Sequence, residues 1–159
     1  MFTAGQLICG GLSWDYLKSQ VRQGNWQRPY RGVYATFSGE LPRAAELWAA
    51  VLAAGPGAML SYESAAEAAG LADKPSRVIH LTVPATRRVT SIPGISVHVS
   101  ERAEAARHPA KLPPQTTVEE TVLDLAGAAA QSQRWHSDRS GRRSPALCRS
   151  PRPAGTLRC

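Results

Sequence analysis

The chain has 159 residues, 43% of them hydrophobic, which is enough to form one compact domain or two small ones. No apolar run approaches the length of a membrane span and no signal peptide is recognisable, so the sequence excludes a membrane protein and predicts a cytoplasmic one. Its three cysteines lie far apart, which excludes a disulfide framework and a zinc-binding spacing.

The net charge of +7 is unevenly distributed along the chain. Residues 1–130 carry 12 basic and 11 acidic side chains, a balance of +1, whereas residues 131–159 carry seven arginines and one aspartate, a balance of +6. A basic chain usually indicates a nucleic-acid partner. Because the excess lies almost entirely in the last segment, only the local balance of +3 in residues 1–35 bears on DNA binding by a folded part of the chain.

Two short helices are predicted at the start of the chain. Thr3 and Gln6 have the spacing of a capping box, which opens a helix ending at Cys9. After a Gly-Gly turn, Ser13 is a suitable N-cap for a second helix over residues 14–23. We expect Cys9 to be a small buried residue of the first helix.

The second helix has an apolar stripe and a polar face. The stripe, which we expect to point inward, comprises Trp14, Leu17 and Val21. The opposite face comprises Asp15, Lys18, Ser19 and Arg22.

A basic hairpin is predicted directly after this helix, with strands over residues 26–28 and 30–35 joined by a turn at Pro29. A polar helix face beside a basic hairpin is typical of a winged helix–turn–helix, in which the helix enters the major groove of double-stranded DNA and the hairpin reaches phosphates. The same spacing and charge fit a structural or protein-binding role equally well. The predicted DNA-binding domain spans residues 1–36, and its expected DNA contacts are Lys18, Ser19, Arg22, Arg28 and Arg31.

A small mixed α/β domain is predicted over residues 41–130. Its first helix has Pro42 in the first turn and an apolar stripe of Leu41, Ala45, Trp48 and Leu52. A short strand over residues 58–60 and a helix capped by Ser61 follow. Two alternating strands come next, and their inward faces comprise Ile79, Leu81 and Val83, and Ile95, Val97 and Val99. The last helix opens at a Thr117/Glu120 capping box, and its apolar stripe comprises Val118, Val122, Leu125, Ala126 and Ala129.

Candidate chemistry in this second domain is sparse. His80 and His98 alternate with the inward residues, so we expect both to project from one outer face. We interpret them as solvated surface histidines because a metal site would need a third ligand. The acidic residues Glu119, Glu120 and Asp124 are explained by helix capping, the helix dipole and loop contacts. No nucleophile has a base and an orienting group beside it. The sequence therefore predicts no catalytic residue, no metal ligand, no cofactor and no enzyme.

A long hairpin loop over residues 84–94 carries Arg87 and Arg88. This dibasic tip is either a secondary basic contact, to phosphate, RNA or an acidic protein surface, or only a solubilising feature.

Residues 131–159 are rich in Arg, Ser and Pro and show no helical or strand periodicity. We expect a disordered basic tail here, because such a segment buries too little surface to offset its ordering entropy. The tail has two interpretations: an arginine-rich nucleic-acid-binding segment, or the out-of-frame translation of GC-rich DNA, which we favour.

Several segments together resemble a known family. They are, in chain order, Phe2-Thr3, Leu12-Ser13, Val21-Arg22-Gln23-Gly24, Trp26-Gln27-Arg28, Arg31-Gly32-Val33-Tyr34, Gly55 to Ser61 with Ser64-Ala65-Ala66, Ile79 to Pro84, and Thr117 to Ala126. Over about residues 2–129 the chain resembles the AbiEi-type antitoxins, which are the antitoxin and regulator components of type IV toxin–antitoxin systems. The Arg-Gly-Val-Tyr element is the most specific of these pieces.

The resemblance implies a transcriptional regulator whose winged domain represses its own operon and whose C-terminal domain counters a partner toxin of nucleotidyltransferase type. A homodimer on DNA is compatible with it. Relatives of this type generally continue beyond the last predicted helix, so the chain reads as C-terminally truncated or frameshifted. Two alternatives are a nuclease-like protein reduced to its DNA-targeting module and a pure protein-interaction domain.

Overall fold

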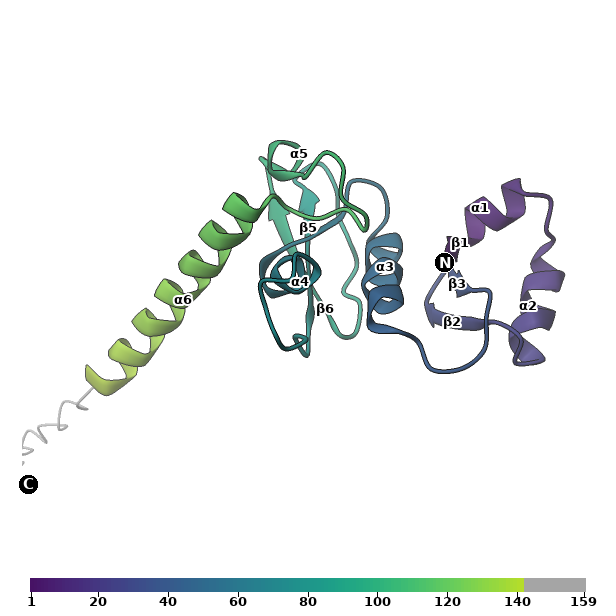
Figure 1. The fold of residues 1–159 in the computed structure, drawn as a ribbon, viewed down its shortest axis with the longest axis horizontal. Helices are drawn as coiled ribbons and strands as arrows, with labels where there is room; N and C mark the ends of the chain where they lie inside the picture. Colours follow the sequence, from purple (N-terminus) through teal and green to yellow (C-terminus); the bar gives the residue numbers. More distant parts are fainter. Residues whose placement is uncertain (142–159) are drawn as a thin grey trace, which may run out of the picture. The chain divides into compact units, whose positions relative to one another are not determined.

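Helices and strands alternate along residues 1–141, the part of the chain that the computed structural model describes, with side-chain placement up to residue 130 (Figure 1). The strands form two sheets of three strands each, so the expected mixed α/β class is confirmed. Residues Met1–Gly127 form one compact unit.

The first sheet is built from the N-terminal elements. These are β1 (Phe2–Thr3), α1 (Ala4–Cys9), α2 (Trp14–Arg22), β2 (Gln27–Tyr30) and β3 (Val33–Ala35). The strands pair antiparallel in the order β1-β3-β2. Both predicted helices are confirmed, and a two-stranded hairpin follows them as expected. Its predicted turn at Pro29 is wrong, because Pro29 belongs to β2 and the turn lies at Arg31 and Gly32, where Gly32 takes a positive φ. Strand β1 was not expected, because two residues are too few to carry a periodic pattern.

The predicted caps of both helices are present. The Thr3 backbone N–H donates to Gln6 Oε1 at 2.8 Å, and the Gln6 N–H donates to Thr3 Oγ1 at 3.2 Å, which completes the capping box of α1. Ser13 Oγ accepts from the Tyr16 N–H at 3.2 Å and caps α2.

The small core under these helices is made by Ala4, Leu7, Leu17 and Tyr34. Val21 and Trp26 pack against it, but Trp14 does not belong to it: 54% of its surface is exposed, and its expected inward position is wrong. Trp14 is the first residue of α2, and helical side chains lean toward the N-terminus, so its ring extends past the end of this core.

The expected burial of Cys9 is also wrong, because Cys9 is exposed. Helix α1 faces the core with Ala4 and Leu7, which are three positions apart. Cys9 follows Leu7 by two positions, a rotation of about 200°, which turns its thiol away from the core.

Helix α3 (Arg43–Ala54) joins the two sheets, because it contacts β1, β2 and β3 as well as β4 and β5. The helix is confirmed, but its predicted stripe is not the buried face. The buried residues are Leu47, Ala49, Ala50, Val51 and Ala54, whereas Ala45, Trp48 and Leu52 are only partly buried. A helix that packs between two sheets buries residues on more than one of its faces. The alanines of α3 allow both sheets to approach it closely.

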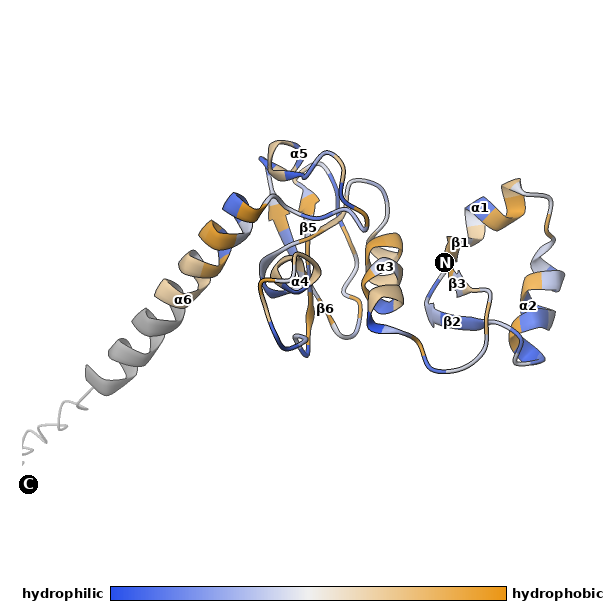
Figure 2. Cartoon of the chain, viewed as in Figure 1, coloured by the Kyte–Doolittle hydropathy of each residue, from blue (hydrophilic) through white to orange (hydrophobic). Residues whose placement is uncertain are grey.

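The second sheet consists of β4 (Met59–Leu60), β5 (Ile79–Pro84) and β6 (Ile95–Ser100) in the order β4-β5-β6. Helix α4 (Tyr62–Ala68) lies between β4 and β5 in the chain, and the short α5 (Ala103–Ala106) follows β6. Ile79, Leu81 and Val83 are buried as predicted, and Figure 2 shows that hydrophobic residues gather on β5 and α3. Val99 is 63% exposed, so the inward face predicted for β6 ends at Val97.

Strands β5 and β6 are parallel, which corrects the predicted hairpin. In a hairpin the loop only reverses the chain, whereas residues 85–94 must return along the sheet before β6 begins. Arg87 and Arg88 consequently lie on a crossover connection and not on a hairpin tip.

Helix α6 (Val118–Gly141) begins where predicted: Thr117 Oγ1 accepts from the Glu120 N–H at 3.4 Å. Its predicted apolar stripe is not buried, since Val118 and Val122 are exposed; the buried anchor is Thr121, whose hydroxyl lies 2.8 Å from that of Thr116. The helix continues past Gln131, where an irregular segment was expected. Ala, Gln and Arg are good helix formers, and the sequence has no proline between Pro114 and Pro145. Residues 142–159 of the predicted tail lie outside the described residues.

Substitutions of Leu17 and Trp14 test which apolar residue of α2 is buried in the core. We expect Leu17→Ala to lower the free energy of unfolding by about 2–5 kcal/mol, because Leu17 is fully buried. Trp14→Ala, although it removes a larger side chain, is expected to change the free energy by less than about 1 kcal/mol because the ring is mostly exposed. Urea unfolding of both variants measures this difference, and equal losses would contradict the assigned orientation of the helix.

Candidate nucleic-acid interface

Helix α2 presents a stripe of exposed residues that combines an aromatic ring with two basic side chains. Trp14, Lys18 and Arg22 follow one another at intervals of four residues, and all three are exposed. Residues four apart on a helix are neighbours on its surface. The position of Trp14 at the head of this stripe was missed by the sequence analysis, which counted it as core.

The two cations of the stripe are available to a ligand. Lys18 Nζ lies 4.0 Å from Asp15 Oδ1, but both side chains are largely exposed, and an exposed pair of this length contributes little. Arg22 forms no ion pair with the described residues. Ser19, the third predicted helix contact, is partly buried, and its Oγ accepts from Gln23 Nε2 at 3.2 Å.

The hairpin carries the other two predicted contacts. Arg28 is exposed on β2, and Arg31 is exposed in the turn between β2 and β3. Gly32 completes this turn with φ of +79°, a left-handed conformation that favours glycine. Its carbonyl accepts from the Ala4 N–H at 2.8 Å, which ties the turn to the start of α1.

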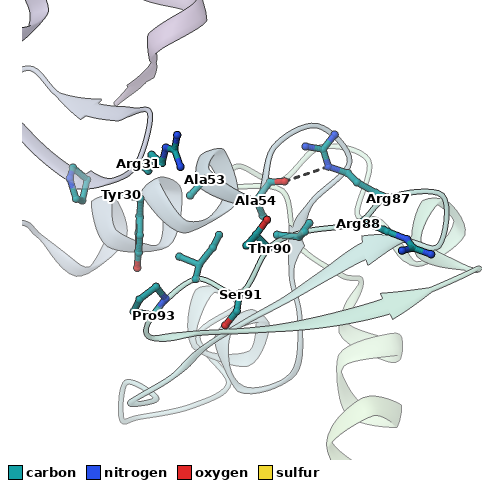
Figure 3. A pocket seen from close by; sticks show the side chains of 12 residues that line it. Tyr30, Arg31, Ala53, Ala54, Arg87, Arg88, Thr90, Ser91 and Pro93 are labelled. Carbon is teal, nitrogen blue, oxygen red and sulfur yellow. Dashed lines mark hydrogen bonds between the residues drawn. The ribbon is translucent and has the colours of Figure 1, made fainter.

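Arg31 and the two arginines of the crossover connection lie around the same pocket, although the sequence separates them. Arg31, Arg87 and Arg88 line one pocket of about 610 Å³, together with the last turn of α3 (Figure 3). Lys18, Ser19, Arg22 and Arg28 do not line it. The hairpin turn lies at the end of β2 that is farther from α2. The predicted DNA contacts therefore form two separate groups, one on α2 and one at the turn.

Arg87 has a structural role that the sequence did not reveal. Its Nε donates to the backbone carbonyl of Ala54 at 3.2 Å, at the end of α3, where unpaired carbonyls favour a cation (Figure 3). Its guanidinium packs against Gly55, where any Cβ would collide with it. Arg87 thus holds the crossover connection against α3, whereas Arg88 is exposed.

The two histidines of the second sheet form a cluster, so their interpretation as solvated surface residues is wrong. His80 Nδ1 and His98 Nε2 lie 3.1 Å apart, His80 Nε2 lies 3.4 Å from Glu63 Oε2, and the Tyr62 ring stacks on His98 with centroids 4.2 Å apart. Strands β5 and β6 pair in parallel register, which places His80 and His98 on one face of the sheet. Tyr62 closes this cluster from α4 with φ of +49°, a rare conformation for an aromatic residue.

The electrostatics of this cluster favour a neutral His98. Burial lowers the pKa of His98 below its ordinary value of 6.5, nearby His80 lowers it further, and Glu63 acts in the opposite direction. In the contact between His80 Nδ1 and His98 Nε2 only one of the two nitrogens carries the proton, because the other must accept it. Among residues 1–130 no three His, Cys, Asp or Glu side chains are arranged to hold a metal ion. We therefore assign this cluster to the packing of α4 on the sheet.

The Glu120 side chain does not cap α6 as expected, because the Thr117 N–H donates to the Ala106 carbonyl at 2.9 Å and the Glu120 carboxylate pairs with an arginine. Arg102 Nη2 donates to Glu120 Oε1 at 2.9 Å. Burial, followed by the nearby Glu120, raises the pKa of Asp124.

The depressed pKa of His98 predicts a loss of stability in mild acid. His98 becomes protonated near pH 6.5 in the unfolded chain but only at lower pH in the folded protein. The contribution of neutral His98 to the free energy of unfolding is therefore complete above about pH 6.5. It declines as the pH falls from there toward the pKa of His98 in the folded protein. Urea unfolding between pH 7.5 and 5, compared with His98→Gln, isolates it. A difference between the two proteins that stays constant over this range would contradict the prediction.

No protein-family model matches the chain, and no curated protein sequence matches it. Within the described part of the chain, no helix is long and apolar enough to cross a membrane.

Proposed function

We propose that this chain is a DNA-binding transcriptional regulator and that α1, α2 and the β2–β3 hairpin act as a winged helix–turn–helix. The observation that carries the proposal is the exposed stripe of α2. Leu17 is fully buried under the stripe and fixes the orientation of the helix, while Trp14, Lys18 and Arg22 project to solvent. A helix held in this way can enter a major groove with two cations and an aromatic ring foremost.

The proposed contacts divide into base-reading and phosphate-binding groups. Lys18 and Arg22 donate to guanine O6 and N7, and Ser19 donates or accepts at a base edge. Trp14, on the same stripe, packs its ring against a thymine methyl group or a sugar. Arg28 and Arg31 on the hairpin bind backbone phosphates, which position the protein without selecting a sequence.

The biological role that we propose is that of an antitoxin-type regulator. Its segments resemble those of the AbiEi-type antitoxins, as described above, and the exposed arrangement of Arg31 and the left-handed Gly32 in the Arg-Gly-Val-Tyr element supports a working hairpin turn. In this role the chain binds its own operator as a regulator and counters a nucleotidyltransferase-type toxin. The second activity is proposed on the sequence resemblance.

Titrating variants with operator and arbitrary DNA tests the division of contacts. On the preferred site, Lys18→Ala or Arg22→Ala should weaken binding by about 1–3 kcal/mol if the residue reads a base, with a much smaller effect on arbitrary DNA. Arg28→Ala should weaken binding to every sequence alike and lower the slope of log K against log salt by about one unit. Fluorescence anisotropy on the region upstream of the gene, over a range of salt concentrations, measures both effects.

Lys111→Ala is the matched control, because Lys111 is exposed but lies far along the chain from both groups. It should leave affinity and salt slope as they are in the unmodified protein. If the Lys18/Arg22/Arg28 triple variant binds operator DNA as tightly as the unmodified protein, the proposed interface is wrong.

A further inference from the structure

The pocket that contains Arg31 has the form of a small-molecule site. It lies between the hairpin turn, the last turn of α3 and the crossover connection, and its volume of about 610 Å³ falls within the range of about 300–1,000 Å³ typical of ligand sites (Figure 3). A DNA duplex presents phosphates on a wide surface and cannot place its bases in a pocket of this size. The shape therefore favours a small ligand over the double helix.

One part of the lining is apolar and includes an aromatic ring. Tyr30 is partly buried against the core that α3 forms with the second sheet, and its side chain lines the pocket. Val89, Ile92 and Pro93 line it from the connection. Thr90 and Ser91, both exposed, add two hydroxyl groups. A lining of this kind fits a ligand with a flat, largely apolar ring system that carries a few polar atoms.

The charged part of the lining is basic without a carboxylate. No Asp or Glu lines the pocket, and neither Arg31 nor Arg88 forms an ion pair with the residues that the structure describes. Both side chains are exposed, whereas Arg87 is held by the Ala54 carbonyl. Unpaired guanidinium groups at the rim of a pocket match phosphate, which they bind through two parallel hydrogen bonds.

We infer that this pocket binds a nucleotide, with the base against the apolar wall and the phosphates on Arg31 and Arg88. A base and its sugar supply the flat body and polar atoms that Tyr30, Thr90 and Ser91 suit, and aromatic side chains commonly stack on bases. A neutral nucleoside lacks the groups that the two arginines recognise.

Arg31 belongs both to this pocket and to the proposed DNA surface. A nucleotide that occupies Arg31 withdraws it from a DNA phosphate, so nucleotide and DNA bind in competition, and each lowers the affinity of the other by the same factor. This consequence rests on the proposed DNA-binding function, whereas nucleotide binding itself does not.

Isothermal titration with ADP and GDP as probes, on the full chain without DNA, tests the pocket. We expect at least one of the two to bind the unmodified protein, adenosine and guanosine to bind at least about tenfold more weakly, and Arg88→Gln or Arg31→Gln to weaken the diphosphate by about tenfold or more. Arg77→Gln is the matched control, because Arg77 is exposed and lies outside the pocket. Unchanged circular dichroism melts confirm that the variants are folded.

Competition on operator DNA is the second measurement. The diphosphate should displace DNA from the unmodified protein and from Arg77→Gln, but at the same concentration not from Arg88→Gln. If neither ADP nor GDP binds, or if Arg88→Gln binds them as tightly as the unmodified protein, the inference is overturned. It is also overturned if Arg88→Gln weakens only DNA, because the pocket then belongs to the DNA interface. Nucleotide binding without DNA binding would refute the proposed function and leave the pocket assignment intact.

Discussion

Helix α3 contacts strands of both sheets, and the rest of the unit depends on its burial between them. Its sequence is mostly small and apolar, and Leu47, Ala49, Ala50, Val51 and Ala54 are all buried. A helix of this composition is not stabilised by a single apolar stripe, so it needs more than one partner. Strand β3 is likewise buried on both of its faces, because all three of its residues are buried. Tyr34 belongs to the N-terminal core, and its neighbours Val33 and Ala35 point to the opposite face. The hairpin is thus fixed relative to α3.

The start of α3 is fixed by a second interaction, centred on Arg43. Its guanidinium forms a two-pronged pair with Glu67 of α4, at 2.8 and 3.0 Å, and also donates to Glu46 at 3.0 Å and to the Ser76 carbonyl at 2.8 Å. This arrangement lowers the pKa of Glu67, chiefly through the hydrogen bonds from Arg43. Arginine is suited to this place because its planar fork satisfies three partners at once. The contact joins α3 and α4 with the segment before β5, where no strand or helix supplies backbone pairing.

The candidate sites follow from these two constraints. Because the hairpin packs on α3, its turn lies beside the C-terminal end of that helix, where Arg87 holds the crossover connection. The glycine at position 55 makes this contact feasible, since φ is +88° and the guanidinium occupies the place of a side chain. The pocket is therefore a product of packing between elements that are far apart in the sequence. The exposed stripe of α2, in contrast, needs only the small core around Leu17.

The sequence by itself determined the elements whose signals lie within a few residues. The capping residues Thr3 and Ser13 and the alternation of Ile79, Leu81 and Val83 act through local hydrogen bonds and side-chain direction, and each predicted its element correctly. The basic residues of α2 and the hairpin were likewise found from local pattern. Their exposure agrees with that pattern, while their binding to DNA stays a prediction.

Only the tertiary structure decided which apolar residues are buried and which distant residues meet. The exposure of Trp14 and Val99, the parallel pairing of β5 with β6 and the contact between His80 and His98 depend on where a core ends and on how a connection returns. The placement of Arg31, Arg87 and Arg88 around one pocket has the same origin. Hydrophobic periodicity shows that a residue is apolar on one face, but burial depends on whether another element covers that face, and that information is spread over the whole chain.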